Sequence, residues 1–314
     1  MFVTEHLARA SSTLFSYEII PPPRGRSAQE ILAIVEQVRP FAPPFIDVTS
    51  HSAEASYEES GDGTIRRRVR KKRPGTISIC GIIQNRYGID TVPHLLCRGF
   101  TREETEDAMI ELAFLGINNV LAIRGDETNY HKMIGAHRTA NIWAGELVEQ
   151  LDGLRHGRYL EDIANSDPMP LCIGVGGYPE KHVEAPNLKS DVGHLRSKVD
   201  AGADYVVTQM FFENSHFLRF QAACREAGIG VPLIPGLKVL TRPRQLTTLS
   251  RDFHVTFPEA LADEVTANPT HAEEIGIRWA TAQVEGLIAA GAPCIHFYVM
   301  NDARAVIEVI RRLG

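Results

Sequence analysis

A single glutamate, Glu18, stands near the end of an apolar stretch that could form a β-strand, TLFSYEI (13–19). Alternate residues of a strand point to opposite faces, so Ser16 and Glu18 should face away from the bulkier side that carries Tyr17. A carboxyl group held inside a protein has a raised pKa and can serve as a general acid. Three prolines (21–23) then stiffen the exit from the strand. The alternative is a surface glutamate on a strand of different register.

A second polar group ends the predicted strand NVLAIRG (119–125), where Arg124 and Gly125 are followed by Asp126. Glycine permits a tight turn or the close approach of a ligand, and the flanking charges suit a polar, nucleotide-like partner. An Arg–Asp ion pair that closes a loop is the alternative.

Two further strands carry polar side chains. In YVVTQMF (205–211) the amide of Gln209 can donate and accept at once, which suits the edge of a heterocycle. In TVPHLLC (91–97), His94 is a candidate base or ligand. A glutamine at the rim of the core and a structural histidine are the alternatives.

The composition excludes several classes of protein. The chain has 314 residues, 44% of them hydrophobic and 23% charged, with a net charge of −6, which is typical of a soluble globular protein and argues against nucleic-acid binding. Its five cysteines form no C-x-x-C pair, so neither a disulfide framework nor a metal site is expected. No apolar run has the length of a membrane span. We expect a cytoplasmic protein without nucleic-acid or membrane partners.

Predicted strands and helices alternate along the whole chain. The strands are expected at 13–19, 45–50, 91–97, 119–125, 171–177, 205–211, 232–237 and 294–300. The helices are expected at 27–39, 101–116, 191–202, 215–228, about 271–291 and 302–313, and the type of 76–88 stays open. Alternation predicts parallel βαβ units, and about eight of them is the number in a closed barrel. We predict an α/β protein with a single (β/α)8 TIM barrel as its one domain (1–314), with loop elaborations at 51–75 and 126–168.

One local run, RRRVRKKR (66–73), is basic at seven of its eight positions. We interpret it as the solvated limb of a hairpin on an acidic protein. A site for a phosphate or for the polyanionic tail of a substrate is the alternative.

Eight motifs, taken in order, resemble those of the methylenetetrahydrofolate reductase family. They are FSYEIIPPP, DVTS, PHLLC, AIRGD, GGYPEKHVEAPN, KVDAGADYVVTQMFF, IPGLKVL and HFYVMN, and they run from about residue 13 to the end of the chain. The resemblance implies a (β/α)8 barrel and a flavoenzyme. It implies that NAD(P)H reduces bound FAD, which then passes a hydride to 5,10-methylenetetrahydrofolate in a ping-pong reaction that gives 5-methyltetrahydrofolate. We also expect a homo-oligomer whose partners are small molecules.

The resemblance also implies roles for individual residues. Glu18 matches the general acid, Asp126 matches an aspartate beside the flavin and the pterin, and Gln209 and Gln245 match substrate contacts. The positions implied to contact FAD or NAD(P)H are Thr49, His94, Arg124, Gly125, Asp126, Ala144, Tyr178, His182, Ala185, Asp191 and Lys198.

Several positions depart from the family pattern. Ser50 and Trp143 stand where tyrosines are common, and Asp302 stands where an arginine meets the folate tail. These departures lie around the flavin and the tail site, whereas Glu18 is kept. Two other functions stay open at this point. One is a flavin-independent barrel lyase or aldolase that uses Glu18 and Asp126 as an acid–base pair, and the other is a folate-binding protein that retains only the pocket.

Overall fold

In a computed structural model of the protein, which describes residues 1–126 and 132–314, eight parallel strands close into a barrel. Their order around the barrel is β1-β10-β9-β8-β7-β6-β5-β2. The strands are β1 (Leu14–Ile19), β2 (Phe45–Val48), β5 (Asp90–Leu96), β6 (Asn119–Ile123), β7 (Cys172–Gly177), β8 (Tyr205–Met210), β9 (Leu233–Leu237) and β10 (Cys294–Met300). The predicted (β/α)8 barrel is confirmed.

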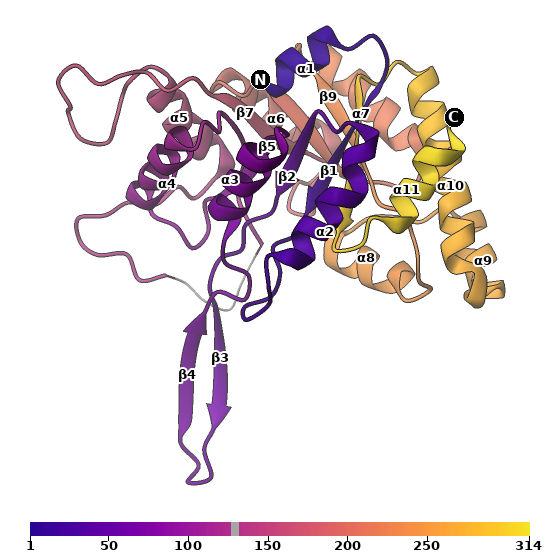
Figure 1. Ribbon diagram of the computed structural model, residues 1–314, viewed down its shortest axis with the longest axis horizontal. Helices are drawn as coiled ribbons and strands as arrows, with labels where there is room; N and C mark the ends of the chain where they lie inside the picture. The colour runs from indigo at the N-terminus through magenta and orange to yellow at the C-terminus, as the bar shows by residue number, and fades with distance from the viewer. Residues whose placement is uncertain (127–131) are drawn as a thin grey trace.

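Helices follow the strands and cover the outside of the barrel (Figure 1). They are α2 (Gln29–Val38), α3 (Thr76–Tyr87), α4 (Arg102–Phe114), α5 (Ala144–Arg155), α6 (Leu188–Asp200), α7 (Asn214–Glu226), α8 (Gln245–Phe253), α9 (Glu259–Ala267), α10 (Ala272–Ala289) and α11 (Arg304–Arg312). Short 3-10 turns lie at Arg39–Phe41 and Pro269–His271. Among the described residues, no helix is long and apolar enough to span a membrane.

The segment 76–88, whose type the sequence left undetermined, forms the helix α3. Its β-branched residues favour a strand locally, but β2 and β5 are parallel neighbours, and parallel neighbours need a crossover between them. The helix α3 supplies that crossover. The helices α8 and α9 add two elements between β9 and α10 that the sequence did not predict.

The predicted elaboration at 126–168 contains an ordinary barrel helix, α5, between β6 and β7. Residues 127–131 of that segment lie outside the described residues. Two predicted strands are also shorter than expected: 45–50 ends at Val48 and 119–125 ends at Ile123. Gly125 has a φ of +85°, a left-handed conformation that a strand does not continue. Thr49 and Asp126 therefore lie in loops.

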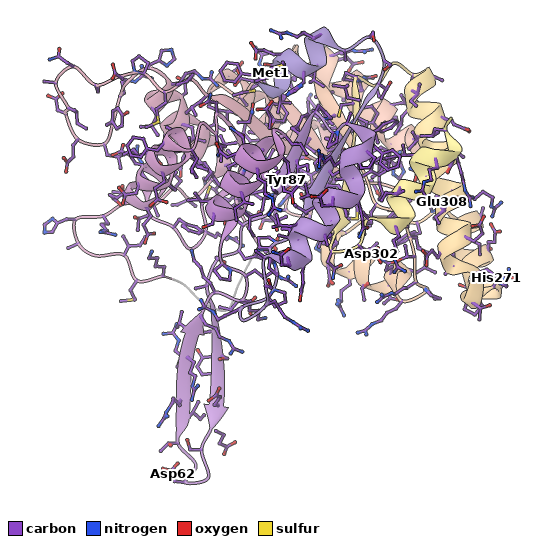
Figure 2. The ribbon with its side chains drawn as sticks, viewed as in Figure 1. Met1, Asp62, Tyr87, His271, Asp302 and Glu308 are labelled. Carbon is purple, nitrogen blue, oxygen red and sulfur yellow. The ribbon has the colours of Figure 1, made fainter. Side chains whose placement is uncertain are left out.

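The elaboration at 51–75 contains an antiparallel hairpin of β3 (Glu54–Glu59) and β4 (Ile65–Arg70). The hairpin projects well beyond the barrel, with Asp62 at its tip (Figures 1 and 2). Every residue of β4 is exposed, and Arg68 pairs with Glu58 across the hairpin at 3.0 Å. Residues 66–70 of the basic run thus form the solvated hairpin limb that the sequence predicted, whereas Lys71 and Arg73 at its end are half-buried.

The amino end of the barrel is closed by α1 (Val3–Arg9). Val3 is fully buried and packs with the inward side chains Phe45 and Tyr205. Glycine makes room for these large rings, because a Cβ at Gly174 would lie 2.4 Å from the Tyr205 ring. The lower barrel is therefore a dry, close-packed floor, and the space for polar side chains lies above it, toward the carboxyl ends of the strands.

The packing of α10 gives a test of the fold. A Cβ at Gly276 would lie 1.8 Å from the carbonyl oxygen of Leu240, so Gly276→Ala should destabilise the protein by about 1–3 kcal/mol, although alanine favours helices. Gly193→Ala in α6 is the matched control, because a Cβ there meets nothing within 4 Å and should stabilise by about 0.5–1 kcal/mol. Urea unfolding measures both effects. Changes of the same sign in the two variants would contradict the packing.

Candidate active site

Two carboxyl groups and one imidazole meet inside the upper barrel. Glu18 and Asp47 are opposite each other in the register of β1 and β2, and His94 projects from β5. The Nε2 atom of His94 lies 3.6 Å from Oε2 of Glu18 and 3.4 Å from Oδ2 of Asp47. The exposed fractions are only 8% for Glu18, 0% for Asp47 and 5% for His94. The inward direction that strand alternation predicted for Glu18 is confirmed.

Burial controls the protonation of this cluster. Loss of solvation raises the pKa of Glu18 to about 7; His94 and Lys238 act to lower the pKa, while the charges of Asp47 and Asp126 act to raise it. Burial also raises the pKa of Asp47 to about 7 and lowers the pKa of His94. Glu18 therefore keeps a substantial share of its protons near neutral pH, which is what a general acid requires.

A second imidazole, that of His296 on β10, lies below this cluster. Its Nδ1 atom is 2.9 Å from Oγ of Ser16 and 3.9 Å from Oδ1 of Asp47. Burial lowers the pKa of His296. Asp47 and His296 stand in the motifs DVTS and HFYVMN, but neither was predicted as a site residue. The alternation of side chains that turned Glu18 inward, applied to the strands that contain DVTS and HFYVMN, would have turned Asp47 and His296 inward as well.

Lys238, just after β9, is another residue of this region that was not predicted from the sequence. Its ammonium donates to the carbonyl oxygen of Tyr298 at 2.6 Å, and burial lowers its pKa to about 8. The hydroxyl of Tyr298 in turn donates to the carbonyl oxygen of Thr208 at 2.6 Å. Lys238 and Tyr298 thus lie near Glu18 on the side of β9 and β10. We call the buried region around Glu18, Asp47 and His94 the chamber.

The loop after β6 carries the predicted residues Arg124, Gly125 and Asp126. The guanidinium of Arg124 makes a two-point contact with the carboxylate of Glu184, at 2.7 and 2.8 Å, and lies 5.1 Å from the centre of the Trp143 ring. Asp126 is exposed, and its charge is among those that raise the pKa of Glu18. The loop therefore connects the solvent side of the barrel with the buried acid.

The loop after β7 and the helix α6 bring five more predicted residues together. The rings of Tyr178 and His182 meet edge to face at 4.7 Å, and the His182 amide donates to Asp191 at 3.0 Å. The Lys198 ammonium donates to the carbonyl oxygen of Gly176 at 2.6 Å, and burial lowers its pKa to about 8. Ala185 is buried in the same loop.

The remaining predicted residues lie around these groups. The hydroxyl of Thr49 is buried and has no hydrogen-bond partner among the described residues. Ala144 is the first residue of α5. The side-chain oxygen of Gln209 accepts a hydrogen bond from the neighbouring Met210 amide at 2.9 Å. The structure gives Gln245 a local role, because its side-chain oxygen accepts from the Thr241 and Arg242 amides at 2.7 and 2.8 Å just before α8.

A cavity of about 280 Å³ lies beside His94, between α3, β5 and α4. The basic run contributes Lys71 and Arg73 to its wall, and Lys71 lies 4.5 Å from the centre of the Phe100 ring. The exposed hairpin limb thus ends in two cations beside the buried cluster.

A parallel barrel with buried carboxyl and imidazole groups at the carboxyl ends of its strands belongs to the (β/α)8 class, whose sites lie at that face. The family model described as methylenetetrahydrofolate reductase matches residues 3–314. The chain therefore belongs to the methylenetetrahydrofolate reductase family, as its motifs indicated.

Two curated relatives show the extent of the likeness. Methylenetetrahydrofolate reductase 1 of Schizosaccharomyces pombe is 29% identical over 307 residues, which cover 96% of this chain and 46% of the relative. The 5,10-methylenetetrahydrofolate reductase of Salmonella typhimurium is 29% identical over 302 residues, which cover 95% of this chain and 90% of the relative. The chain thus spans about half the length of the yeast relative and most of the bacterial one.

Among solved structures, the fold is similar to that of a protein from Clostridium thermocellum described as binding two copies of 5-methyl-5,6,7,8-tetrahydrofolic acid. The TM-score is 0.59 at 12% sequence identity, and the match covers 98% of this chain and 96% of that one. At this identity the likeness concerns the fold.

The raised pKa of Glu18 predicts a pH-dependent stability. Its ordinary value is 4.5 and its folded value is about 7, so between these pH values the folded protein binds more protons than the unfolded chain, and this contribution to stability falls as pH rises. Glu18→Gln removes the ionisation. The variant should therefore gain stability over the native protein between pH 5 and pH 8, by on the order of 2 kcal/mol.

Urea unfolding at several pH values measures this gain. Glu285→Gln, the same change at an exposed position on α10, is the control and should leave the pH dependence as it is. Parallel stability curves for Glu18→Gln and the native protein would contradict the assigned burial effect.

Proposed function

We propose that the protein reduces 5,10-methylenetetrahydrofolate to 5-methyltetrahydrofolate with NAD(P)H as the electron donor and FAD as the bound cofactor. Family membership over residues 3–314 supports the reaction class. The observation that carries the proposal within the site is Glu18, an acid buried at the mouth of the barrel whose pKa is raised to about 7 by loss of solvation. Reduction of a bridged methylene group needs such a proton donor.

The loops after β2, β6 and β7 have a donor set that fits FAD. The buried Thr49 hydroxyl lacks a partner in the described part of the chain, and Gly125 adopts a left-handed conformation that admits close approach to the backbone. Arg124 and Lys198 offer the cationic groups that bind phosphates. The further residues that would line the cofactor are His94, Asp126, Ala144, Tyr178, His182, Ala185 and Asp191.

When bound, FAD would take a hydride from NAD(P)H and pass it to the methylene carbon of the folate. Glu18 supplies the proton that opens the methylene bridge. Its O–H bond breaks as an N–H bond forms on the departing amine nitrogen. The bond from the methylene carbon to that nitrogen then breaks, and the lone pair of the other bridge nitrogen forms the C=N bond of an electrophilic iminium, with a carboxylate left on Glu18. Burial beside His94 holds the proton in place until the amine takes it.

The folate contacts would come from Asp126, Gln209 and Gln245. The amide of Gln209, half-buried at the end of β8, can donate to and accept from the edge of a pterin. Gln245 would keep its side-chain oxygen on the amides before α8 and offer its NH₂ group. Asp126 is exposed, so it can reach a ligand at the barrel mouth.

The cellular setting belongs to the same proposal. The five cysteines are buried free thiols, which suits the reducing cytoplasm. We propose a cytoplasmic homo-oligomer with small-molecule partners. Sedimentation of the purified protein tests the oligomeric state.

The direct test of the function uses the purified protein with FAD. The protein should take up FAD and become yellow, NAD(P)H should bleach the flavin, and methylenetetrahydrofolate should restore its colour in stopped-flow experiments. A protein that takes up no FAD would overturn the proposal in favour of a flavin-independent reaction. A protein whose reduced flavin does not react with the folate would also overturn it.

Glu18→Gln separates the two half-reactions. Flavin reduction by NAD(P)H should stay within about twofold of the native rate, because it needs no proton from Glu18. Reoxidation by the folate should fall by at least about 10²-fold, since general acid catalysis typically contributes 10²–10⁴-fold. Stopped-flow absorbance measures both, with Glu285→Gln as the control. Equal losses in the two half-reactions would mean that Glu18 is structural.

Asp126→Asn tests the charge at the barrel mouth. A negative charge near the flavin disfavours its anionic reduced form, so its removal should raise the flavin midpoint potential by a few tens of millivolts, where 30 mV corresponds to about 1.4 kcal/mol for two electrons. Reoxidation by the folate should slow accordingly. Spectroelectrochemical titration measures the potential. An unchanged potential would rule out this role of Asp126.

A further inference from the structure

Asp47 is a buried acid without a dedicated hydrogen-bond donor. Its exposed fraction is 0%, and within the described part of the chain neither carboxyl oxygen has a hydrogen-bond partner. Its nearest polar neighbours are imidazole nitrogens, with His94 Nε2 at 3.4 Å and His296 Nδ1 at 3.9 Å. Buried polar groups without partners are rare in folded proteins because each costs free energy, so this position calls for an explanation.

Other partly or fully buried acids in this protein have the donors that Asp47 lacks. Asp191 accepts from the His182 amide at 3.0 Å. Asp204 accepts from the Ile173 amide at 2.7 Å and pairs with Arg155. Such donors favour the charged form of a carboxyl group and fix the chain around it, although burial still raises the pKa of Asp204. Asp47 has no comparable structural bond, so its protonation depends on the titratable groups around it.

The titratable groups around Asp47 come from the surrounding strands and from α3. They are Glu18 on β1, Cys80 on α3, His94 on β5, Tyr205 on β8, and Cys294, His296 and Tyr298 on β10. Burial raises the pKa of each thiol and phenol in this set, so these groups stay protonated at neutral pH. The groups of this set that can change charge with Asp47 are therefore one carboxyl group and two imidazoles.

The same His94 nitrogen faces both acids. Nε2 can hold a proton toward Glu18 or toward Asp47, but the two carboxyl groups cannot both ionise beside it without placing two negative charges in a dry chamber. The negative charge of Asp47 indeed raises the pKa of Glu18. The charges of Lys238 and Asp126 also act on the pKa of Glu18, which Lys238 lowers and Asp126 raises.

We propose that Asp47 is a positioning residue for proton transfer by Glu18: facing the same nitrogen of His94, its carboxylate keeps the proton on Glu18 until the folate amine takes it. This inference rests on the proposed function. Among the described residues, no group of three or more histidine, cysteine, aspartate or glutamate side chains is placed to hold a metal ion. Asp47 touches neither the folate nor the cofactor in this account and acts only through Glu18 and His94.

The test is the pH profile of the folate half-reaction in Asp47→Asn. The native rate should fall as pH rises through about 7, where Glu18 loses its proton. Without the charge of Asp47, the midpoint should move down by about one pH unit, so the rate at pH 8 should drop about tenfold while the rate at pH 5.5 stays near the native value. A purely structural role would lower the rate at every pH and leave the midpoint in place.

The matched control is Asp204→Asn, the same change at an acid just before β8, outside the Glu18 cluster. It should leave the midpoint unchanged. His296→Gln is the second variant and covers the case in which Asp47→Asn fails to fold. His296 lowers the pKa of Asp47, so its loss should leave Asp47 more protonated and move the Glu18 midpoint in the same downward direction.

Infrared titration of the Glu18 carboxyl band, identified by its loss in Glu18→Gln, gives a reading that needs no folate reaction. A downward shift of this band's midpoint in Asp47→Asn or His296→Gln supports the proposal, and a native midpoint in both variants overturns it. If the native protein fails to transfer electrons to the folate, the proposed function fails, while the infrared midpoint still decides whether Asp47 controls the proton on Glu18.

Discussion

The structure depends on a closed barrel that places two carboxyl groups around one imidazole, away from water. Glu18, Asp47 and His94 come from three adjacent strands, and the barrel closure rather than local sequence brings them within 3.4 to 3.6 Å. Burial raises the pKa of both acids toward neutrality, which keeps protons in the chamber. This burial costs folding free energy, because two carboxyl groups lie away from water with few hydrogen-bond donors around them. The packing around the cluster must offset that cost.

The lower barrel provides this support. The helix α1 closes the amino end, where Val3 packs against an apolar layer that includes Phe45 and Tyr205. Glycine at 174 makes room for the Tyr205 ring, which is fully buried in this layer. The polar layer above it then meets solvent only at the carboxyl ends of the strands, which is where a substrate can approach.

The buried chamber and the region nearer to solvent carry different chemical groups. The chamber holds the proton on Glu18, whereas the loop after β6 and the helix α6 carry the cationic groups Arg124 and Lys198, which are of the kind that binds phosphates. Asp126 links the two regions, because it lies in a loop and its charge still acts on Glu18.

The sequence by itself determined the eight strands of the barrel and the direction of Glu18. Hydrophobic alternation is a local property, so it predicted the eight strands, the barrel and the inward carboxyl group. It could not determine 76–88, where β-branched residues favoured a strand until the parallel pairing of β2 and β5 required a crossover helix. Nor did it single out Asp47 and His296. Their importance comes from closure of the barrel, which sets distances between residues far apart in the chain and removes the water that would otherwise screen them.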